Sequence, residues 1–445
     1  MTNQSTSRRG FLKTSATATA AAAATSCLWP HTSVAAAEKP KSFLIAQIGC
    51  GGMGRGDAGA HGIGGRIAAI CDVDKGQTAR AMRNRRIGGH KPEIFTEYRR
   101  VLDRKDIDVV GIGTPDHWHV KIAIEALQAG KHVFCQKPLT LTLEENQLCR
   151  AAAKKYNKQV FFVGTQQRSD AGRFLRAVNM VQKGLLGKMK KVTVGINGGA
   201  RGGPFEKKTP PASLDWNTWL GQTPKVDYIP ERCHGSFRWW YEYSGGKFTD
   251  WGAHHVDIAT WALGRDKEGM GPVEFDGTDA NHPVPFKDGY PTVDNAFNTA
   301  HDYAVKCKFD DGVEMVITSR GDNGITFEGT KGKIFVNRGK VVGKPIQEKW
   351  DEGKYTNEDQ SKLYKGKPRE GHKHNFYRCI REGGLPVSDV FSHVQAMNTC
   401  HLAAIAARVG GVIKWDPKAE KISGNDVAAG LFARPQRKGF EIPRV

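Results

Sequence analysis

The first half of the chain alternates short apolar runs with stretches in which apolar residues recur at helical spacing. An apolar run of about four to eight residues between turn signals is typical of a strand buried on both faces of a sheet. Helical spacing appears between these runs, for example over residues 120–130 and 143–156. Repeated strand–helix units of this kind predict a doubly wound parallel α/β sheet. The predicted strands are residues 42–48, 66–72, 108–113, 132–135 and 159–163.

From about residue 165 the strand–helix rhythm gives way to shorter runs separated by turn signals such as Asp310-Asp311-Gly312. This pattern predicts a second, α+β domain with an open, mostly antiparallel sheet. We therefore expect a first domain over residues 38–165 and a second over residues 166–445. In the second domain we expect strands at 191–197, 303–309, 313–319, 325–329 and 333–337, and helices at 374–382 and 390–408.

A long segment rich in aromatic residues, Gly and Pro, residues 198–244, interrupts the second domain. Loops of this length inside a domain are usually functional or disordered. Its Trp and Tyr rings, Trp240 among them, offer flat apolar faces that suit stacking on sugar rings. The same rings could instead hold the segment against its own domain, and the sequence leaves both interpretations open.

The first 37 residues have the parts of an export signal in the right order. Residues 7–13 form a twin-arginine motif that includes Arg8 and Arg9, residues 14–24 are mildly apolar, and residues 35–37 offer a cleavage site of small residues. We therefore expect twin-arginine export to the periplasm or cell envelope. A disordered Ala-rich tail and a lipid anchor at Cys27 are the alternatives. No stretch of 18 or more apolar residues occurs, so we expect no membrane span.

The chain is basic, with a formal net charge of +20, but its Lys and Arg residues are spread along the sequence. Such a charge indicates either a surface that attracts polyanions or simply a soluble basic surface, and both interpretations stay open. No nucleic-acid-binding motif is present, so a nucleic acid partner is not expected. The nine Cys include no C-x-x-C pair and no metal-ligand spacing appears, so we expect neither a disulfide framework nor a metal.

A glycine motif, G-x-G-x-x-G, directly follows the first predicted strand. Its first Gly permits a tight turn, the second lets the backbone approach a pyrophosphate, and the third lets the next helix pack closely. The phosphates would lie at the helix N-terminus, whose free N–H groups favour an anion. The sequence thus predicts a Rossmann domain that holds a dinucleotide at Gly49, Gly51, Gly52, Met53 and Gly54.

An acidic residue, Asp72, ends the second predicted strand at the spacing expected for a carboxylate that binds the adenosine ribose diol. Its negative charge would repel a 2′-phosphate, so the sequence predicts NAD, with NADP less favoured. Ligands of such sheets bind beyond the carboxyl ends of the strands. The further residues at these ends are Thr114, Pro115, His119, Gln136 and Lys137.

Several motifs occur in the order found in one known family. Thr114-Pro115 precedes His119, residues 129–133 lead into Lys137-Pro138, residues 245–257 fit G-G-x-x-x-D-x-G-x-H-x-x-D, and residues 329–332 form a late G-T-x-G. With the glycine motif and Asp72, the chain resembles the Gfo/Idh/MocA oxidoreductases over roughly residues 42–440. The resemblance implies a Rossmann domain, an open-sheet domain that often forms the oligomer interface, and NAD(H)-dependent oxidation of a sugar, glycoside or polyol.

Carried over by motif, the resemblance implies three catalytic residues. Lys137 would hydrogen-bond the reacting hydroxyl, His254 would take its proton as a base of near-neutral pKa, and Asp250 would orient or charge His254. Asp250 and His254 are four residues apart, which places them on one face if both belong to one helix. The chain departs from the family at Gln136, where the family usually has Glu. Substrate contacts are expected among Arg168, Arg238, Trp240, His255 and Asp257.

Two alternatives to net oxidation stay open. The first is redox-neutral glycoside cleavage or epimerisation through a transient keto-sugar, which needs no external supply of NAD. The second is a sugar- or NAD-binding protein without catalysis, which the presence of Lys137 and His254 disfavours. The sequence does not identify the substrate.

Overall fold

The structure is a computed structural model that describes residues 42–346 and 355–445. The export signal expected over residues 1–37 lies outside these residues. Within the described ranges, no helix has both the length and the apolar character needed to cross a membrane. Residues 42–445 form one compact unit in which two sheets are built from different parts of the chain.

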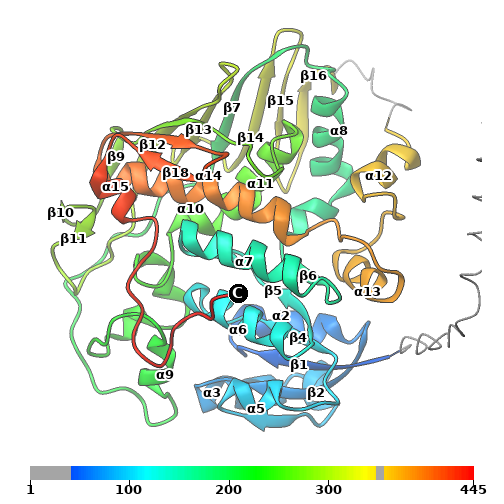
Figure 1. The fold of residues 1–445 in the computed structure, drawn as a ribbon, viewed down its shortest axis with the longest axis vertical. Coiled ribbons are helices and arrows are strands. Elements are labelled where there is room, and N and C mark those ends of the chain that lie inside the picture. Colours follow the sequence, from blue (N-terminus) through cyan, green and yellow to red (C-terminus); the bar gives the residue numbers. More distant parts are fainter. Residues whose placement is uncertain (1–41, 347–354) are drawn as a thin grey trace, which may run out of the picture. The chain divides into compact units, whose positions relative to one another are not determined.

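The first sheet has six strands, all parallel, in the order β3-β2-β1-β4-β5-β6 (Figure 1). The strand order reverses between β1 and β4, which is where such sheets leave a crevice for a ligand. The predicted doubly wound parallel sheet is therefore confirmed. The strands are β1 (Phe43–Ile48), β2 (Gly65–Cys71), β3 (Glu93–Phe95), β4 (Val109–Ile112), β5 (His132–Cys135) and β6 (Phe161–Val163).

Strand β3 was not expected, because it is only three residues long and buries only Phe95. The helices that connect these strands follow the predicted alternation. They are α2 (Gly52–His61), α3 (Lys75–Met82), α4 (Arg85–Gly88), α5 (Tyr98–Leu102), α6 (His119–Gln128) and α7 (Leu143–Lys155).

The second sheet has ten strands, and its main path is β16-β15-β14-β7-β13-β12-β8-β17-β18, with β9 paired to β12. Only β7 and β13 pair in parallel, so the predicted mostly antiparallel sheet is confirmed. The strands are β7 (Met189–Gly195), β8 (Glu274–Asp276), β9 (Ala280–Asn281), β12 (Asp302–Lys308), β13 (Glu314–Thr318), β14 (Gly324–Gly329), β15 (Lys333–Val336), β16 (Val341–Lys344), β17 (Val412–Asp416) and β18 (Lys421–Ser423), and a separate hairpin joins β10 (Phe286–Lys287) to β11 (Tyr290–Pro291).

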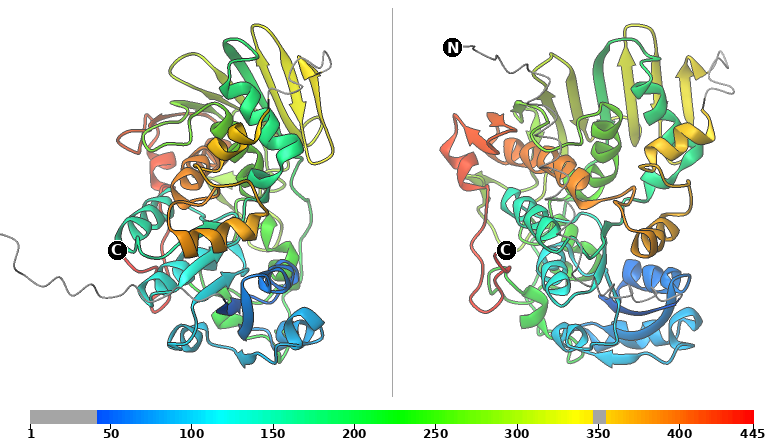
Figure 2. Two further views of the ribbon diagram at one scale, coloured as in Figure 1. Left: turned by 90° about the vertical axis from the view of Figure 1, so that its right-hand side faces the viewer. Right: turned by 45° about the vertical axis from the view of Figure 1, so that its right-hand side comes forward.

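Helices of the second half pack on both sheets. Helix α14 crosses between the sheets and packs against α11 and α7 (Figure 1). Helix α13 lies close to the first sheet (Figure 2). Its Tyr377 ring stacks on Phe43 of β1 with ring centroids 5.7 Å apart. These helices are α8 (Arg176–Gln182), α9 (Trp216–Leu220), α10 (Lys247–Asp250), α11 (Gly252–Ala262), α12 (Asn357–Leu363), α13 (His372–Glu382), α14 (Val390–Val409) and α15 (Asp426–Gly430).

The aromatic segment over residues 198–244 builds a small core of its own. Trp219, Trp240 and Tyr243 are buried in one hydrophobic cluster, and the Trp219 and Tyr243 rings meet edge to face with centroids 4.9 Å apart. Most of these rings therefore hold the segment in place, while the segment as a whole forms a wall over the end of the first sheet.

Candidate active site

The turn between β1 and α2 has the geometry that the glycine motif predicts. Gly49 adopts a φ of +83°, which favours glycine, and a Cβ on Gly54 would lie 1.9 Å from the Gly49 carbonyl oxygen. A Cβ at Gly51 or Gly52 would meet nothing within 4 Å. The turn thus packs tightly on its helix side and stays open on the other side, as a phosphate cradle must.

Asp72 lies beside this turn, where its carboxylate is held by two backbone amides. The Cys50 amide donates to Oδ2 at 2.7 Å and the Asp74 amide donates to Oδ1 at 2.9 Å. Burial raises the pKa of Asp72 to about 6. Each oxygen keeps a lone pair for a further donor, such as a ribose hydroxyl.

A cavity of about 290 Å³ lies at the carboxyl ends of β1, β2, β4 and β5. Ten of the eleven residues expected to contact the cofactor line it, and the eleventh, Gly54, packs inside the turn. Walls that the sequence did not predict come from the aromatic segment and include Trp219, Phe237 and His234. The expected residues that line the cavity are Gly49, Gly51, Gly52, Met53, Asp72, Thr114, Pro115, His119, Gln136 and Lys137.

Two buried polar atoms of this cavity, Thr114 Oγ1 and Gln136 Oε1, have no hydrogen-bond partner among the described residues. His119 holds the surrounding backbone, because its Nδ1 lies 2.6 Å from the Pro138 carbonyl and its Nε2 lies 3.0 Å from the Thr114 carbonyl. Burial lowers the pKa of His119 to about 4, so the ring is neutral and its single N–H donates to one of these two carbonyls. The open cradle, the ribose carboxylate and the unpaired polar atoms all fit a dinucleotide.

Lys137 lies just beyond β5 and binds Asp250, the last residue of α10. The Lys137 ammonium donates to Asp250 Oδ1 at 2.7 Å and to the Asp250 carbonyl at 2.9 Å. Arg238 Nε and Lys247 Nζ each lie 3.6 Å from the same carboxylate. Burial alone would raise the pKa of Asp250, but these cations, Lys137 foremost, lower it to about 2.

His254 lies on α11, and its relation to Asp250 differs from the prediction. The helical run breaks at Trp251, so the two residues belong to different helices, and no hydrogen bond joins them in the described structure. Asp250 binds Lys137 instead. Burial, and next the charge of Lys137, lower the pKa of His254 well below its ordinary value. The expected near-neutral pKa is therefore wrong, and His254 is a neutral imidazole.

The neighbouring His255 is engaged on both sides of its ring. Its Nδ1 lies 3.2 Å from the Gln167 side chain and its Nε2 lies 2.9 Å from Asn323 Oδ1. The Nδ1 of His254, in contrast, has no hydrogen-bond partner among the residues described. Of the two histidines, His254 is therefore the one that keeps an unpaired ring nitrogen in the described residues, although it does not line the dinucleotide cavity.

A second cavity, of about 670 Å³, adjoins α10 on the side of the second sheet. Trp239, Lys247 and Trp251 line it, and the Arg338 guanidinium lies over the Trp251 ring at 4.6 Å from the centroid. Lys137 and Arg238 line the dinucleotide cavity, whereas Lys247 lines the second cavity, and all three surround Asp250. Asp250 thus lies between the two cavities.

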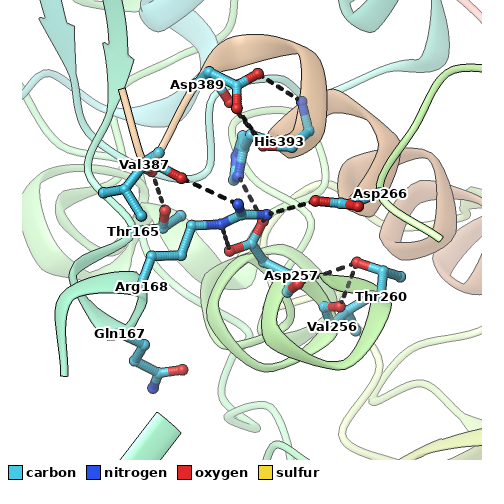
Figure 3. Close-up of polar contacts among 12 residues, drawn as sticks. Thr165, Gln167, Arg168, Val256, Asp257, Thr260, Asp266, Val387, Asp389 and His393 are labelled. Carbon is cyan, nitrogen blue, oxygen red and sulfur yellow. Dashed lines mark hydrogen bonds and ion pairs between the residues drawn. The ribbon is translucent and has the colours of Figure 1, made fainter. Parts of the chain in front are cut away.

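Four of the five residues expected to contact substrate, His255 among them, line neither of these two cavities. Arg168 and Asp257 form a fully buried ion pair, in which Nε and Nη2 of Arg168 donate to the carboxylate at 2.6 and 2.9 Å (Figure 3). This pair joins the segment after β6 to α11, so it holds elements together. Trp240 is also fully buried, and its indole donates to the Glu231 carbonyl at 2.9 Å. Arg238, by comparison, lines the dinucleotide cavity.

A contact with Asp57 explains why Gln136 stands where the family usually has Glu. The Gln136 amide donates to Asp57 Oδ2 at 2.6 Å, and the other oxygen of Asp57 lies 2.9 Å from the Lys373 ammonium. A Glu at position 136 would bring a second carboxylate against Asp57. Sequence reasoning missed Asp57 and Lys373, because they lie on α2 and α13, far from the strand end that Gln136 follows.

Comparisons with known proteins agree with this geometry. Residues 43–165 match the model of an oxidoreductase family with an NAD-binding Rossmann fold, and residues 174–442 match the model of its C-terminal α/β domain. The first domain is therefore an NAD-binding domain of an oxidoreductase. The chain belongs to the Gfo/Idh/MocA oxidoreductase family.

Individual relatives differ in the reactions that their names give. An α-N-acetylgalactosaminidase of Shewanella oneidensis is 32% identical over 204 residues, which cover 41% of this chain and 44% of that protein. A glycosyl hydrolase family 109 protein of a Shewanella species is 34% identical over 204 residues, with the same coverage. The chain thus spans less than half the length of the curated relatives it matches.

Solved structures share the fold at low sequence identity. The WlbA dehydrogenase of Bordetella pertussis, in complex with NADH and UDP-GlcNAcA, is 19% identical with a TM-score of 0.58, over 84% of this chain and 98% of that one. A levoglucosan dehydrogenase in complex with NADH and levoglucosan is 19% identical with a TM-score of 0.56, over 84% and 99%.

The raised pKa of Asp72 predicts a pH-dependent affinity for NADH. A ribose hydroxyl donates more strongly to an ionised carboxylate, so affinity should fall as the pH drops through about 6. Asp72→Asn should weaken binding roughly 10- to 100-fold near neutral pH and remove this pH dependence. Fluorescence titration with NADH from mildly acidic to mildly basic pH measures both effects. The exposed Asp106→Asn serves as the control, and a wild-type affinity that does not change with pH contradicts the assignment.

The Gln136–Asp57 contact predicts that Gln136→Glu destabilises the protein. The change removes the donor and places two carboxylates together, which raises the pKa of one of them. A raised pKa contributes stability at low pH that is lost as the pH rises, so the loss should be larger in mildly basic than in acidic buffer. We expect a loss of about 1–3 kcal/mol in the basic buffer, measured by urea unfolding. Combining it with Asp57→Asn should restore stability, and an unchanged single variant at both pH values would refute the explanation.

Proposed function

We propose that the protein is an NAD-dependent oxidoreductase that acts on a ring hydroxyl of a sugar, glycoside or polyol. The placement of Lys137 carries this proposal. Its side chain lines the dinucleotide cavity and is fixed by Asp250, whose carboxylate lies 3.6 Å from Lys247 of the second cavity. We call the region around Asp250, between the two cavities, the junction. A cation held there is in position to meet both a cofactor and the hydroxyl that reacts with it.

Each residue around this junction would have a separate role in the oxidation of a hydroxyl group. Lys137 donates a hydrogen bond to the substrate oxygen and stabilises the negative charge that develops there. Neutral His254 accepts the hydroxyl proton, and Asp250 positions the Lys137 ammonium. The residues of the dinucleotide cavity would hold NAD, which would supply a hydride acceptor for this oxidation. One hydroxyl-bearing carbon thus becomes a ketone, while one proton and one reduced nicotinamide are formed.

The second cavity has the surface that a sugar ring requires. Trp239 and Trp251 supply aromatic faces, and Asn323 and Asn337 supply amides that donate to and accept from hydroxyl groups. The cavity volume of about 670 Å³ falls within the range typical of small-molecule sites. These features support a sugar or polyol as the substrate.

A second candidate function is redox-neutral cleavage of a glycoside, or epimerisation, through a transient keto-sugar. The relatives named α-N-acetylgalactosaminidase and glycosyl hydrolase family 109 protein favour it, because each aligns with this chain over 204 residues, at 32% and 34% identity respectively. The same Lys137, His254 and Asp250 would serve both reactions, since each begins with oxidation of a hydroxyl. The two functions differ in whether reduced nicotinamide accumulates.

The assignment predicts the effects of replacing the junction residues. With NAD and a panel of sugars, glycosides and inositols, Lys137→Ala and His254→Ala should each lower kcat by roughly 10²- to 10⁴-fold. Lys154→Ala, on the exposed side of α7, is the matched lysine control and should leave the rate unchanged. Turnover is followed by the absorbance of reduced nicotinamide and, in the same samples, by chromatography of the sugars.

The paired readouts separate the candidates. Net formation of reduced nicotinamide supports the dehydrogenase, whereas a new sugar product without it supports the redox-neutral reaction. Turnover that is equally fast in Lys137→Ala and wild type rejects both functions.

We further propose that the protein is exported by the twin-arginine route to the periplasm or cell envelope. The motif over residues 7–13 and the small residues at 35–37 support this. Replacing both Arg8 and Arg9 with Lys should retain the protein in the cytoplasm, as measured by cell fractionation. Lys13→Arg is the charge-conserving control, and export of the double variant at the wild-type level would contradict the proposal.

A further inference from the structure

A third cavity, of about 750 Å³, lies apart from the two cavities of the candidate active site. It is lined by residues just before α7, at the end of the aromatic segment, in β11, in the second half of α14 and after α15. We call it the arginine cavity, because Arg408 and Arg434 line it together with Tyr241, Glu242 and Tyr290. Neither the family match nor the proposed reaction assigns it a ligand.

Arg408, in the last turn of α14, is held in a fixed orientation. Its Nε donates to the Gly289 carbonyl at 2.8 Å, and its guanidinium lies 4.9 Å from the Tyr241 ring centroid and 5.2 Å from that of Tyr290. In the described ranges no carboxylate lies within ion-pair distance of Arg408, and its two Nη groups donate no hydrogen bond. Its charge is therefore oriented but not neutralised.

Arg434 enters the cavity from the chain after α15. Its Nη1 donates to the Glu242 carbonyl at 2.6 Å, whereas its Nη2 is buried without a hydrogen-bond partner in the part of the chain described. The closest carboxylate oxygen, Glu145 Oε1, lies 3.8 Å from Nη2. Arg434 is thus also fixed by one backbone carbonyl and left with an unused donor.

Two acids lie nearby: Glu145 is the ion-pair partner of Arg434, and neither acid accepts a hydrogen bond from a guanidinium Nη2 of this cavity. Glu242 is 3.1 Å from Arg232 and accepts from the Asn298 amide at 2.9 Å. Glu145 accepts from the Leu141 amide at 2.6 Å, and burial raises its pKa. Burial, and to a lesser extent Arg434, lowers the pKa of Arg408, so the two guanidinium groups repel each other in a poorly solvated space. Such charges are costly unless an anion pairs with them.

We propose that the arginine cavity binds a small organic anion, whose carboxylate, sulfate or phosphate group pairs with Arg408 and Arg434. Guanidinium groups offer planar pairs of N–H donors that match these oxygen acceptors. The cavity has room for a sugar-sized molecule around the anionic group. Thr223, Ser244 and His401 line the same cavity and supply polar contacts for the rest of the ligand.

One hydrogen bond separates this site from the dinucleotide cavity. Ser244, which lines the arginine cavity, donates to Asp116 Oδ2 at 2.6 Å, and Asp116 lines the dinucleotide cavity. The two cavities are distinct but adjacent, so anion binding must be measured with the dinucleotide site already filled.

The test is calorimetric titration of the exported protein, saturated with NADH, using three anionic probes and a neutral one. The anionic probes are D-glucuronate, D-glucose 6-sulfate and D-glucose 6-phosphate, and D-glucose is the neutral probe. We expect saturable binding of at least one anionic probe. Arg408→Gln and Arg434→Gln should each weaken it about tenfold or more, because each removes a charged hydrogen bond. The matched control is Arg338→Gln, which alters the second cavity and should leave the affinity unchanged.

Three results would overturn the proposal: no wild-type binding of any anionic probe, binding of glucose that Arg408→Gln and Arg434→Gln weaken as much as they weaken binding of the anions, or loss of anion binding in Arg338→Gln but not in the two cavity variants. The last result would place the anion in the second cavity. If Arg408→Gln does not fold, Arg434→Gln carries the same comparison, because its guanidinium hydrogen-bonds only one backbone carbonyl. The order of affinity among the three probes tells carboxylate, sulfate and phosphate ligands apart.

Discussion

The ion pair between Lys137 and Asp250 is the contact on which the candidate active site depends. It joins the end of a strand in the NAD-binding domain to a helix of the second domain, and both side chains are largely buried. Removing one partner of a buried pair leaves an uncompensated charge and typically costs about 3–5 kcal/mol. The pair therefore favours contact between the two domains at this point, where Lys137 of the first cavity and Lys247 of the second both lie near Asp250.

Charge around this pair is arranged so that each ionisable group has a defined state. Asp250 is surrounded by Lys137, Arg238 and Lys247, whose charges lower its pKa to about 2. Its carboxylate is therefore ionised at neutral pH. His254 stays neutral, because burial, and next the charges of Lys137 and Arg338, lower its pKa. Behind the cavity, Gln136 takes the place of an acid beside Asp57, whose charge is already matched by Lys373. The departure from the family's usual Glu thus avoids a clash of two carboxylates and leaves Lys137 in place.

Much of the fold follows from local pattern. Apolar runs predicted five strands of the first sheet, and shorter runs between turn signals predicted the main strands of the second, because burial within a sheet imposes such local patterns on the chain. Strand β3 has no such period over its three residues. The cofactor residues were predictable for a related reason, since a glycine turn and strand ends are short segments whose geometry depends on neighbouring residues.

Partners distant in the chain were not predictable. The pairing of Arg168 with Asp257, and of Gln136 with Asp57 and Lys373, arises only when separate elements pack together. The break at Trp251 likewise has no marker such as Pro, so Asp250 and His254 looked like members of one helix. In each case the prediction relied on residues close in the sequence. In the folded protein, the side chain contacts a residue that is distant in the chain instead.

The central claim is that this chain holds NAD beside Lys137, and the most direct measurement is the nicotinamide content of the purified protein. Protein isolated without added cofactor, and then incubated with an excess of NAD and desalted, is denatured and the released nicotinamide is quantified. We predict about one NAD per chain after incubation, and its partial reduction when a substrate sugar is present during incubation. A protein that releases no nicotinamide after either treatment would contradict the account, because the cavity at the glycine turn would then serve some other ligand.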